Sequence, residues 1–171
     1  MDIENPKIPP NSIDSEQSVL GGLLLHNDSW DNVVNIISSD DFYQASHRII
    51  YDAIVILLEH DKPADILTVK EQVIKTHDEE SIGGFAYLAQ IAENTPSVSN
   101  IDAYAKHVRE LSIFRQLIKI GRELADTAFH PKDIEVNNLL DLSERKIFEI
   151  AEQVSRNKQE ITNVKDIIKD V

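Results

Sequence analysis

The chain has 171 residues, no cysteine and a formal net charge of −13 at pH 7. The lack of cysteine excludes disulfides, thiolate zinc sites and cysteine nucleophiles. The negative charge argues against nucleic-acid binding by this chain, because phosphate contacts need clustered lysine and arginine. The sequence has no run of about eighteen apolar residues and no apolar signal core, and therefore predicts a cytoplasmic protein that does not enter a membrane.

The N-terminal region predicts an arm followed by a helix. Residues 1–11 contain three prolines, and we expect them to be flexible. The helix is capped by Ser12 or Asp14. Gly21 and Gly22 fall inside it, where each costs roughly 1 kcal/mol relative to alanine. No Lys-Ser or Lys-Thr pair follows them, so we interpret these glycines as a site of close helix packing rather than as a phosphate loop.

Four further helices are expected before the middle of the chain. Ser29 caps a short helix, and Ser46 caps a longer one. Thr68 followed by Glu71 fits a capping box at the start of the third. The pair Gly83-Gly84 predicts a turn that leads into the fourth.

We therefore expect an all-α fold, with a compact helical bundle over residues 12–97 and a long antiparallel helical hairpin over residues 98–154. One apolar stripe of the first hairpin helix is Tyr104, Val108, Leu111, Ile118, Gly121, Ala125 and Ala128. The second is Ile113, Leu117, Ile120 and Leu124. Two stripes offer more surface than one partner helix can cover, so part of this surface is expected to meet another domain or subunit.

The chain is expected to turn at His130-Pro131, because proline cannot continue a helix. It returns through Val136, Leu140, Ile147, Ile150 or Ala151, and Val154. Polar residues follow from Ser155 to Gln159, and a helical apolar pattern then restarts. We interpret residues 155–171 as the truncated start of an interdomain linker in a longer protein.

Acidic residues near histidines raise the alternative of a small metal-dependent helical hydrolase. Its candidate residues are Asp40 and Asp41 with His47, or His77 with Glu79 and Glu80. We favour a structural role for the aspartates, because adjacent carboxylates point in different directions and are favoured before a helix N-terminus. A regulatory helical adaptor that binds a different protein partner is a second alternative.

Ordered motifs along the chain carry a family resemblance. They are Ile8-Pro9-Pro10, Ser12 to Gly22, Asp40-Asp41-Phe42-Tyr43, His47-Arg48-Ile49-Ile50, Leu67-Thr68-Val69, Ile82 to Leu88, Asn94-Thr95-Pro96-Ser97, Asn100-Ile101 and Tyr104-Ala105. Together they resemble the opening of bacterial replicative DNA helicases of the DnaB family. The match is specific because several motifs occur in the family's order and cover nearly all of the chain after the arm.

The resemblance implies the N-terminal domain of such a helicase without its motor. No Gly-x-x-x-x-Gly-Lys-Ser/Thr sequence occurs, so we expect no enzyme activity and no cofactor, with ATP and Mg confined to the motor domain. In the family this domain forms the collar of a hexameric ring, which is assembled as a trimer of dimers. The collar binds the C-terminal domain of primase.

The family resemblance and the apolar stripes both indicate that the hairpin carries contact surfaces. The predicted primase-binding residues are Tyr87, Arg115, Ile118 and Leu124. The predicted self-association residues are Leu117, Ile120, Ile147 and Phe148, because a symmetric dimer buries the same stripe from each copy. Arg115, Lys119 and Arg122 share one side as a positive strip, for which ordinary pairing with Glu123 or Asp126 is the alternative.

Overall fold

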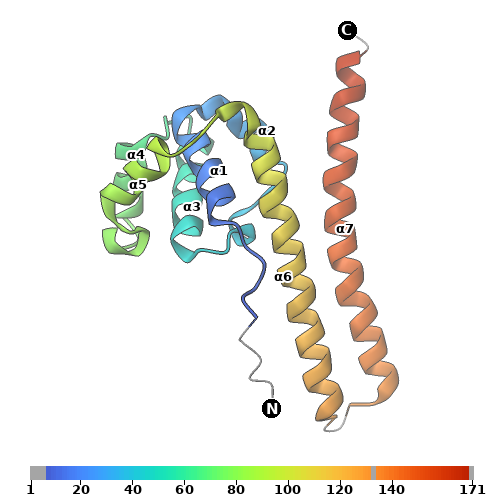
Figure 1. Ribbon diagram of the computed structural model, residues 1–171. Helices are drawn as coiled ribbons and strands as arrows, with labels where there is room; N and C mark the ends of the chain where they lie inside the picture. Colours follow the sequence, from blue (N-terminus) through green and yellow to red (C-terminus); the bar gives the residue numbers. More distant parts are fainter. Residues whose placement is uncertain (1–6, 132–133, 170–171) are drawn as a thin grey trace. The chain divides into compact units, whose positions relative to one another are not determined.

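The computed structural model describes the backbone of residues 7–131 and 134–169, and the side chains of these residues except Val98 and residues 156–169. Within this part of the chain the regular structure is entirely helical, which confirms the all-α prediction (Figure 1). The α-helices are α1 (Ile13–Leu25), α2 (Trp30–Val33), α3 (Ala45–Glu59), α4 (Ile66–Val73), α5 (Gly84–Glu93), α6 (Ile101–Phe129) and α7 (Val136–Lys169).

The two ends of the chain are described only in part. Residues 1–6 of the predicted arm lie outside the described residues, as do the side chains of most of the predicted linker. The backbone of α7 runs to Lys169, through the segment 155–159 in which we expected a linker. Across the described residues, no helix is both long enough and apolar enough to span a lipid bilayer.

Local capping sets the starts of the helices. Ser12 is the N-cap of α1, where its hydroxyl accepts a hydrogen bond from the backbone N–H of Ser15. At α4 the predicted capping box is wrong. Asp65 is the N-cap, and the side chains of Asp65 and Thr68 each accept a hydrogen bond from the other's backbone N–H, at 2.9 and 2.8 Å. Thr68 therefore closes the box, because aspartate is the stronger N-cap and directly precedes the apolar turn.

The predicted cap of α3 is also wrong. Gln44 occupies the N-cap position with extended backbone, and its side chain makes no capping hydrogen bond. Ser46 lies inside the first turn. The carboxylate of Glu16, from α1, accepts hydrogen bonds from the backbone N–H groups of Tyr43 and Gln44 at 2.6 and 3.4 Å. A distant side chain thus satisfies backbone donors at this helix start.

The described residues up to Ser112 form one compact unit, here called the globular unit. Its largest fully buried apolar side chains are Leu20, Leu23, Phe42, Ile50, Ile54, Ile82, Leu88 and Ile91. The start of α6 belongs to this unit and buries one side chain per turn, namely Ile101, Ala105, Val108 and Ser112. Of the stripe predicted for this part of α6, Val108 is buried and Tyr104 packs against the core from a half-buried position.

Helices α1 and α5 approach closely at the glycine pair. A Cβ atom on Gly21 would lie 1.8 Å from Oγ1 of Thr95 and 2.7 Å from the carbonyl oxygen of Ile91. A Cβ atom on Gly22 would lie 2.7 Å from Cδ1 of Ile101. These distances leave no room for a methyl group and confirm that both glycines serve close packing.

Residues 113–171 form the second compact unit, made of the remainder of α6 and α7. The two segments run in opposite directions, as expected for a helical hairpin (Figure 1). Lys146 of α7 donates a hydrogen bond to the carboxylate of Glu123 on α6, which ties the two helices together.

Candidate interaction surfaces

Tyr87, the first predicted primase-binding residue, is anchored in a polar cluster of the globular unit. Its hydroxyl lies 2.7 Å from Nε2 of His47 and accepts a hydrogen bond from Gln17 at 3.0 Å. The tyrosine and imidazole rings stack with their centroids 5.9 Å apart. Nδ1 of His47 lies 2.6 Å from the carboxylate of Glu16. Because Tyr87 is half-buried, it both completes this cluster and reaches the surface.

The hydrogen bonds of this cluster form a consistent chain of donors and acceptors. The carboxylate of Glu16 accepts hydrogen bonds from the backbone N–H groups of Tyr43 and Gln44 and also contacts Nδ1 of His47. The hydroxyl of Tyr87 accepts a hydrogen bond from the side-chain amide of Gln17 and contacts Nε2 of His47. Both ring nitrogens of the buried histidine are therefore occupied. The arrangement favours a structural role, because buried polar groups stabilise a fold when they are all paired.

The first set of predicted hydrolase residues is not assembled. Asp41 is buried and accepts hydrogen bonds from the backbone N–H of Ser38 at 2.8 Å and from Arg109 at 2.6 Å. His47 is held by Glu16 instead. Asp41 therefore connects the loop before α3 to α6, and its chemistry is that of a cap and an ion pair.

The second set is likewise occupied by local contacts. Nδ1 of His77 lies 2.8 Å from the hydroxyl of Thr76. Glu79 pairs with Lys70 at 3.1 Å and accepts a hydrogen bond from the backbone N–H of Phe85 at 3.2 Å. Among the described residues, no group of three histidine or carboxylate side chains is placed to hold a metal ion.

The other three predicted primase-binding residues lie on the second half of α6, but they do not share one side of it. Ile118 is exposed and lies one turn after Arg115. Leu124 is half-buried and lies nine residues after Arg115, two and a half turns along the helix. Arg115 and Leu124 therefore point to opposite sides of α6. Tyr87 belongs to the other compact unit.

The predicted self-association residues are largely exposed in the single chain. The exposed fractions of Leu117, Ile147 and Phe148 are 41%, 50% and 60%, whereas Ile120 is half-buried. Large apolar side chains in this number are unusual on a surface that stays in water.

Helix α7 has two neighbouring sides of different exposure. We predicted a single stripe, but the structure buries Ile150 and leaves Leu140, Ile147 and Val154 at 61%, 50% and 39% exposure. The three exposed residues recur every seven positions. Leu140 and Val154 were not among the predicted contact residues, although this seven-residue repeat is visible in the sequence.

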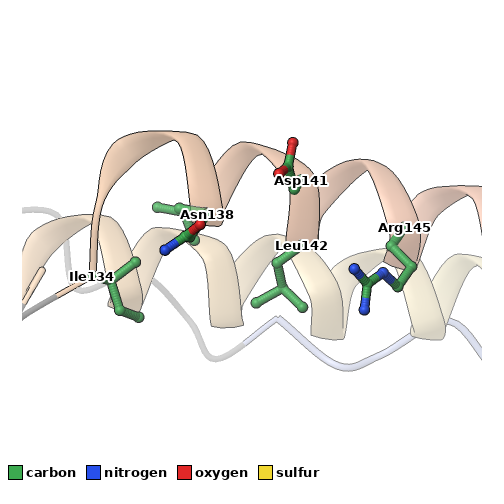
Figure 2. Close-up of a pocket in the computed structure, with 6 residues that line it drawn as sticks. Ile134, Asn138, Asp141, Leu142 and Arg145 are labelled. Atoms are coloured by element: carbon green, nitrogen blue, oxygen red, sulfur yellow. The ribbon is translucent and has the colours of Figure 1, made fainter.

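A shallow hollow of about 380 Å³ lies at the start of α7. Its lining includes Ile134, Asp141, Leu142 and Arg145, which are drawn as sticks in Figure 2. Ile134 and Leu142 are both exposed. The hollow thus adds apolar surface to the hairpin.

The ion pair of the hairpin changes the acidity of one carboxyl group. The hydrogen bond from Lys146, followed by the positive charge of that lysine, holds the pKa of Glu123 below its ordinary value. Lys119 contributes in the same direction. The positive strip of α6 therefore has at least one acidic neighbour, as the ordinary-pairing alternative predicted.

The fold matches a known protein family. Residues 8–110 match the family described as the DnaB-like helicase N terminal domain. The replicative DNA helicase DnaB of Pasteurella multocida is 41% identical over 162 residues, which cover 95% of this chain and 35% of that protein. The replicative DNA helicase DnaC of Bacillus subtilis is 36% identical over 167 residues, which cover 98% and 36%. The chain spans about a third of the length of these relatives.

Solved structures agree with this match. The crystal structure of the N-terminal domain of DnaB helicase from Mycobacterium tuberculosis has a TM-score of 0.79 and 31% identity, and the match covers 83% of this chain and 99% of that one. A DnaB-like replicative helicase, described together with its interactions with primase, has a TM-score of 0.65 at 19% identity and supports the fold alone. The family match covers more than half of the chain, and the chain therefore belongs to the DnaB-like helicase N-terminal domain family.

Proposed function

We propose that this chain is the non-catalytic collar domain of a bacterial replicative DNA helicase, through which helicase subunits associate and primase is bound. The observation that carries the proposal is the exposed apolar side of the hairpin, above all Leu140, Ile147 and Phe148, in a chain of this family. Such a side is costly in water and is stabilised when another protein surface covers it.

The exposed apolar stripe of α7 supports self-association. A two-fold dimer brings the same surface of each copy into contact, so one apolar stripe is sufficient for both partners. Ile147 and Phe148 on α7, with Leu117 and Ile120 on α6, are the proposed contact residues. In the complete helicase we expect three such dimers to form the ring.

Primase is the proposed second partner, and its binding is expected to depend on the oligomer. The solved structure of one similar DnaB-like replicative helicase is described together with its interactions with primase, which supports this choice. Arg115 and Leu124 point to opposite sides of α6. A primase domain that contacts these residues together with Tyr87 and Ile118 therefore meets more than one face, and residues from two copies offer a direct way to supply them.

We further propose that the chain binds neither ATP nor Mg²⁺ and acts in the cytoplasm. The sequence contains no phosphate-binding Gly-x-x-x-x-Gly-Lys-Ser/Thr loop. The relatives are about three times as long, and we assign ATP hydrolysis to the part that this chain does not match. Calorimetric titration with Mg-ATP is expected to give no binding heat, and saturable heat would contradict this assignment.

The deciding experiment is a calorimetric titration of the chain with the C-terminal domain of primase from the same organism, accompanied by light scattering of each component. Saturable binding to a dimer or larger oligomer, at a defined ratio, supports the proposal. If the chain is only a dimer and does not bind, the titration is repeated with the full-length hexameric helicase. Absence of binding by that hexamer would favour the adaptor alternative.

A further inference from the structure

The globular unit has an apolar groove that the proposed hairpin contacts do not use. It lies among the ends of α1, α4 and α5 and has a volume of about 360 Å³. Leu24 and Ala92 are buried within it. Leu25, Leu67 and Phe85 also line it, yet their exposed fractions are 51%, 60% and 45%. Three large exposed apolar side chains in one concavity are more than the scattered single residues of an ordinary surface.

Two further exposed side chains, one acidic and one apolar, follow Leu67 along α4 and at its C-cap. Leu67, Glu71 and Ile74 follow one another at helical spacing, and all three are exposed. Ile74 is 52% exposed. An apolar groove bordered by exposed apolar and acidic side chains is the kind of surface that binds an amphipathic helix, which fills such grooves through residues spaced three and four apart.

The net charge of the globular unit indicates the charge of a partner that could bind in the groove. Residues 1–112 contain 19 aspartate and glutamate residues against 7 lysine and arginine residues, a net charge of −12. Residues 113–171 contain 11 and 10, a net charge of −1. Almost all of the net negative charge of the chain is thus carried by the unit that contains the groove.

Acidic residues also outnumber basic residues close to the groove. Residues 59–93 carry eight acidic and three basic side chains. Asp65 lines the groove, Glu71 follows Leu67 by one turn, and Glu93 follows Ala92 on α5. The basic residue of α4, Lys70, lies 3.1 Å from Glu79 and 5.5 Å from the centre of the Phe85 ring, so its charge is compensated.

We propose that this groove binds a basic amphipathic helix of another protein. The apolar side chains of that helix enter between Leu67 and Phe85, and its flanking lysine or arginine residues face Asp65, Glu71 and Glu93. A second copy of the globular unit is a poor occupant, because two units of charge −12 repel each other. A basic partner is instead attracted to the unit before contact.

The test uses three synthetic peptides titrated into this chain. The first contains leucine at helical spacing and lysine elsewhere, the second has the same composition in an order without an apolar side, and the third replaces each lysine of the first by glutamate. We expect the first peptide to bind about tenfold more tightly than the second, because only the first presents an apolar side to the groove. Its affinity should fall with added salt, and the glutamate peptide should not bind.

Variants of the chain locate the binding. Leu67→Gln is expected to remove the preference for the first peptide, and it should leave the fold intact because Leu67 is mostly exposed. Asp65→Asn should weaken the lysine peptide while retaining the N-cap, since asparagine caps as well as aspartate. The matched control is Ile56→Gln, which changes an exposed apolar residue of α3 and should leave all affinities unchanged.

Four outcomes would overturn the proposal. Equal binding of the first two peptides would reduce the interaction to charge attraction. If Leu67→Gln keeps the preference for the first peptide over the second, the peptide binds at another site. If the glutamate peptide binds, the carboxylates near the groove do not select a basic partner. A lower mass of the Leu67→Gln chain in light scattering, without any peptide, would mean that another copy fills the groove.

Discussion

Gly21 has only a hydrogen atom at the position where any other residue would place a Cβ atom against α5. Gly21→Ala is expected to lower the free energy of unfolding by about 1 to 3 kcal/mol, because the new Cβ would lie 2.7 Å from a backbone oxygen of Ile91 and one helix must shift. Urea unfolding followed by circular dichroism measures the change. The alanine gain in helix propensity opposes this loss and is smaller.

Gly121 provides the matched control for this substitution. A Cβ atom on Gly121 meets no other atom within 4 Å, and the residue lies inside α6. Gly121→Ala should therefore raise the stability of this helix by about 0.5 to 1 kcal/mol. If both alanine variants shifted the urea midpoint in the same direction, packing at Gly21 would not be the cause.

Removal of the Tyr87 hydroxyl tests whether this group stabilises the fold, binds primase, or does both. Tyr87→Phe keeps the ring that stacks on His47 but removes the oxygen that contacts His47 and Gln17. We expect the free energy of unfolding to fall by about 1 kcal/mol, as for the loss of a typical buried hydrogen bond, in urea denaturation.

Gln17→Ala is the companion variant, since it leaves the His47 contact with Tyr87 in place and should cost less than Tyr87→Phe. Unchanged stability of Tyr87→Phe would show that the cluster does not need the hydroxyl. A primase titration of the same folded variant then reports on binding by the phenol oxygen alone.

At the scale of the helix pair, the contact between Glu123 and Lys146 makes a prediction about pH. Lys146→Gln removes the hydrogen bond and the charge that depress the pKa of Glu123, so this pKa should rise towards the ordinary value of a glutamate side chain. Carboxyl chemical shifts recorded during an NMR titration measure it. Lys119→Gln should raise the pKa less, because Lys119 is the smaller cause.

The sign of the stability effect follows from the depressed pKa. The contribution of the pair is present above the pKa of Glu123 in the unfolded chain and is lost as the pH falls through its lower folded value. Both side chains are partly exposed to solvent, so salt and water screen the pair. A pKa of Glu123 that does not change in Lys146→Gln would contradict the observed contact.

Several elements could be predicted because their causes are local. The start of α1 after Ser12, the end of α6 at Phe129 just before His130-Pro131, and the close packing at Gly21 follow from capping, proline and glycine chemistry. The contacts of Glu16 with His47 and of Asp41 with Arg109 join residues 31 and 68 positions apart. No local rule specifies such distances, so neither contact was predicted.

The orientation of α7 about its own axis could not be predicted from the sequence either. Helical periodicity predicted its apolar residues, but Ile150 lies on the buried side and Leu140 and Ile147 on the exposed side. These sides are neighbours, and a rotation of less than a quarter turn exchanges them. The pattern of a single sequence does not fix that rotation, because it depends on what packs against the helix.

For the whole molecule the main prediction concerns association. Ile147→Asp is expected to weaken the proposed dimer by several kcal/mol, because it places a charge in an apolar contact between copies. Ile147 is half exposed in the single chain, so the variant should still fold. Light scattering over a range of concentrations measures the loss of dimer.

Ile56→Asp is the control, because Ile56 is an exposed apolar residue of α3 outside the hairpin. It should leave the mass unchanged. A folded Ile147→Asp chain that remains a dimer would show that α7 is not the interface, whatever the result of the primase titration.

The seven-residue spacing of Leu140, Ile147 and Val154 determines the path of any helix that covers all three. In a straight α-helix, residues seven apart drift by about 20° around the axis, so a parallel straight partner would lose contact along the stripe. A partner that stays on the stripe has to wind around α7 in a left-handed supercoil. The handedness of the assembled contact is therefore already encoded in the side chains of a single α7.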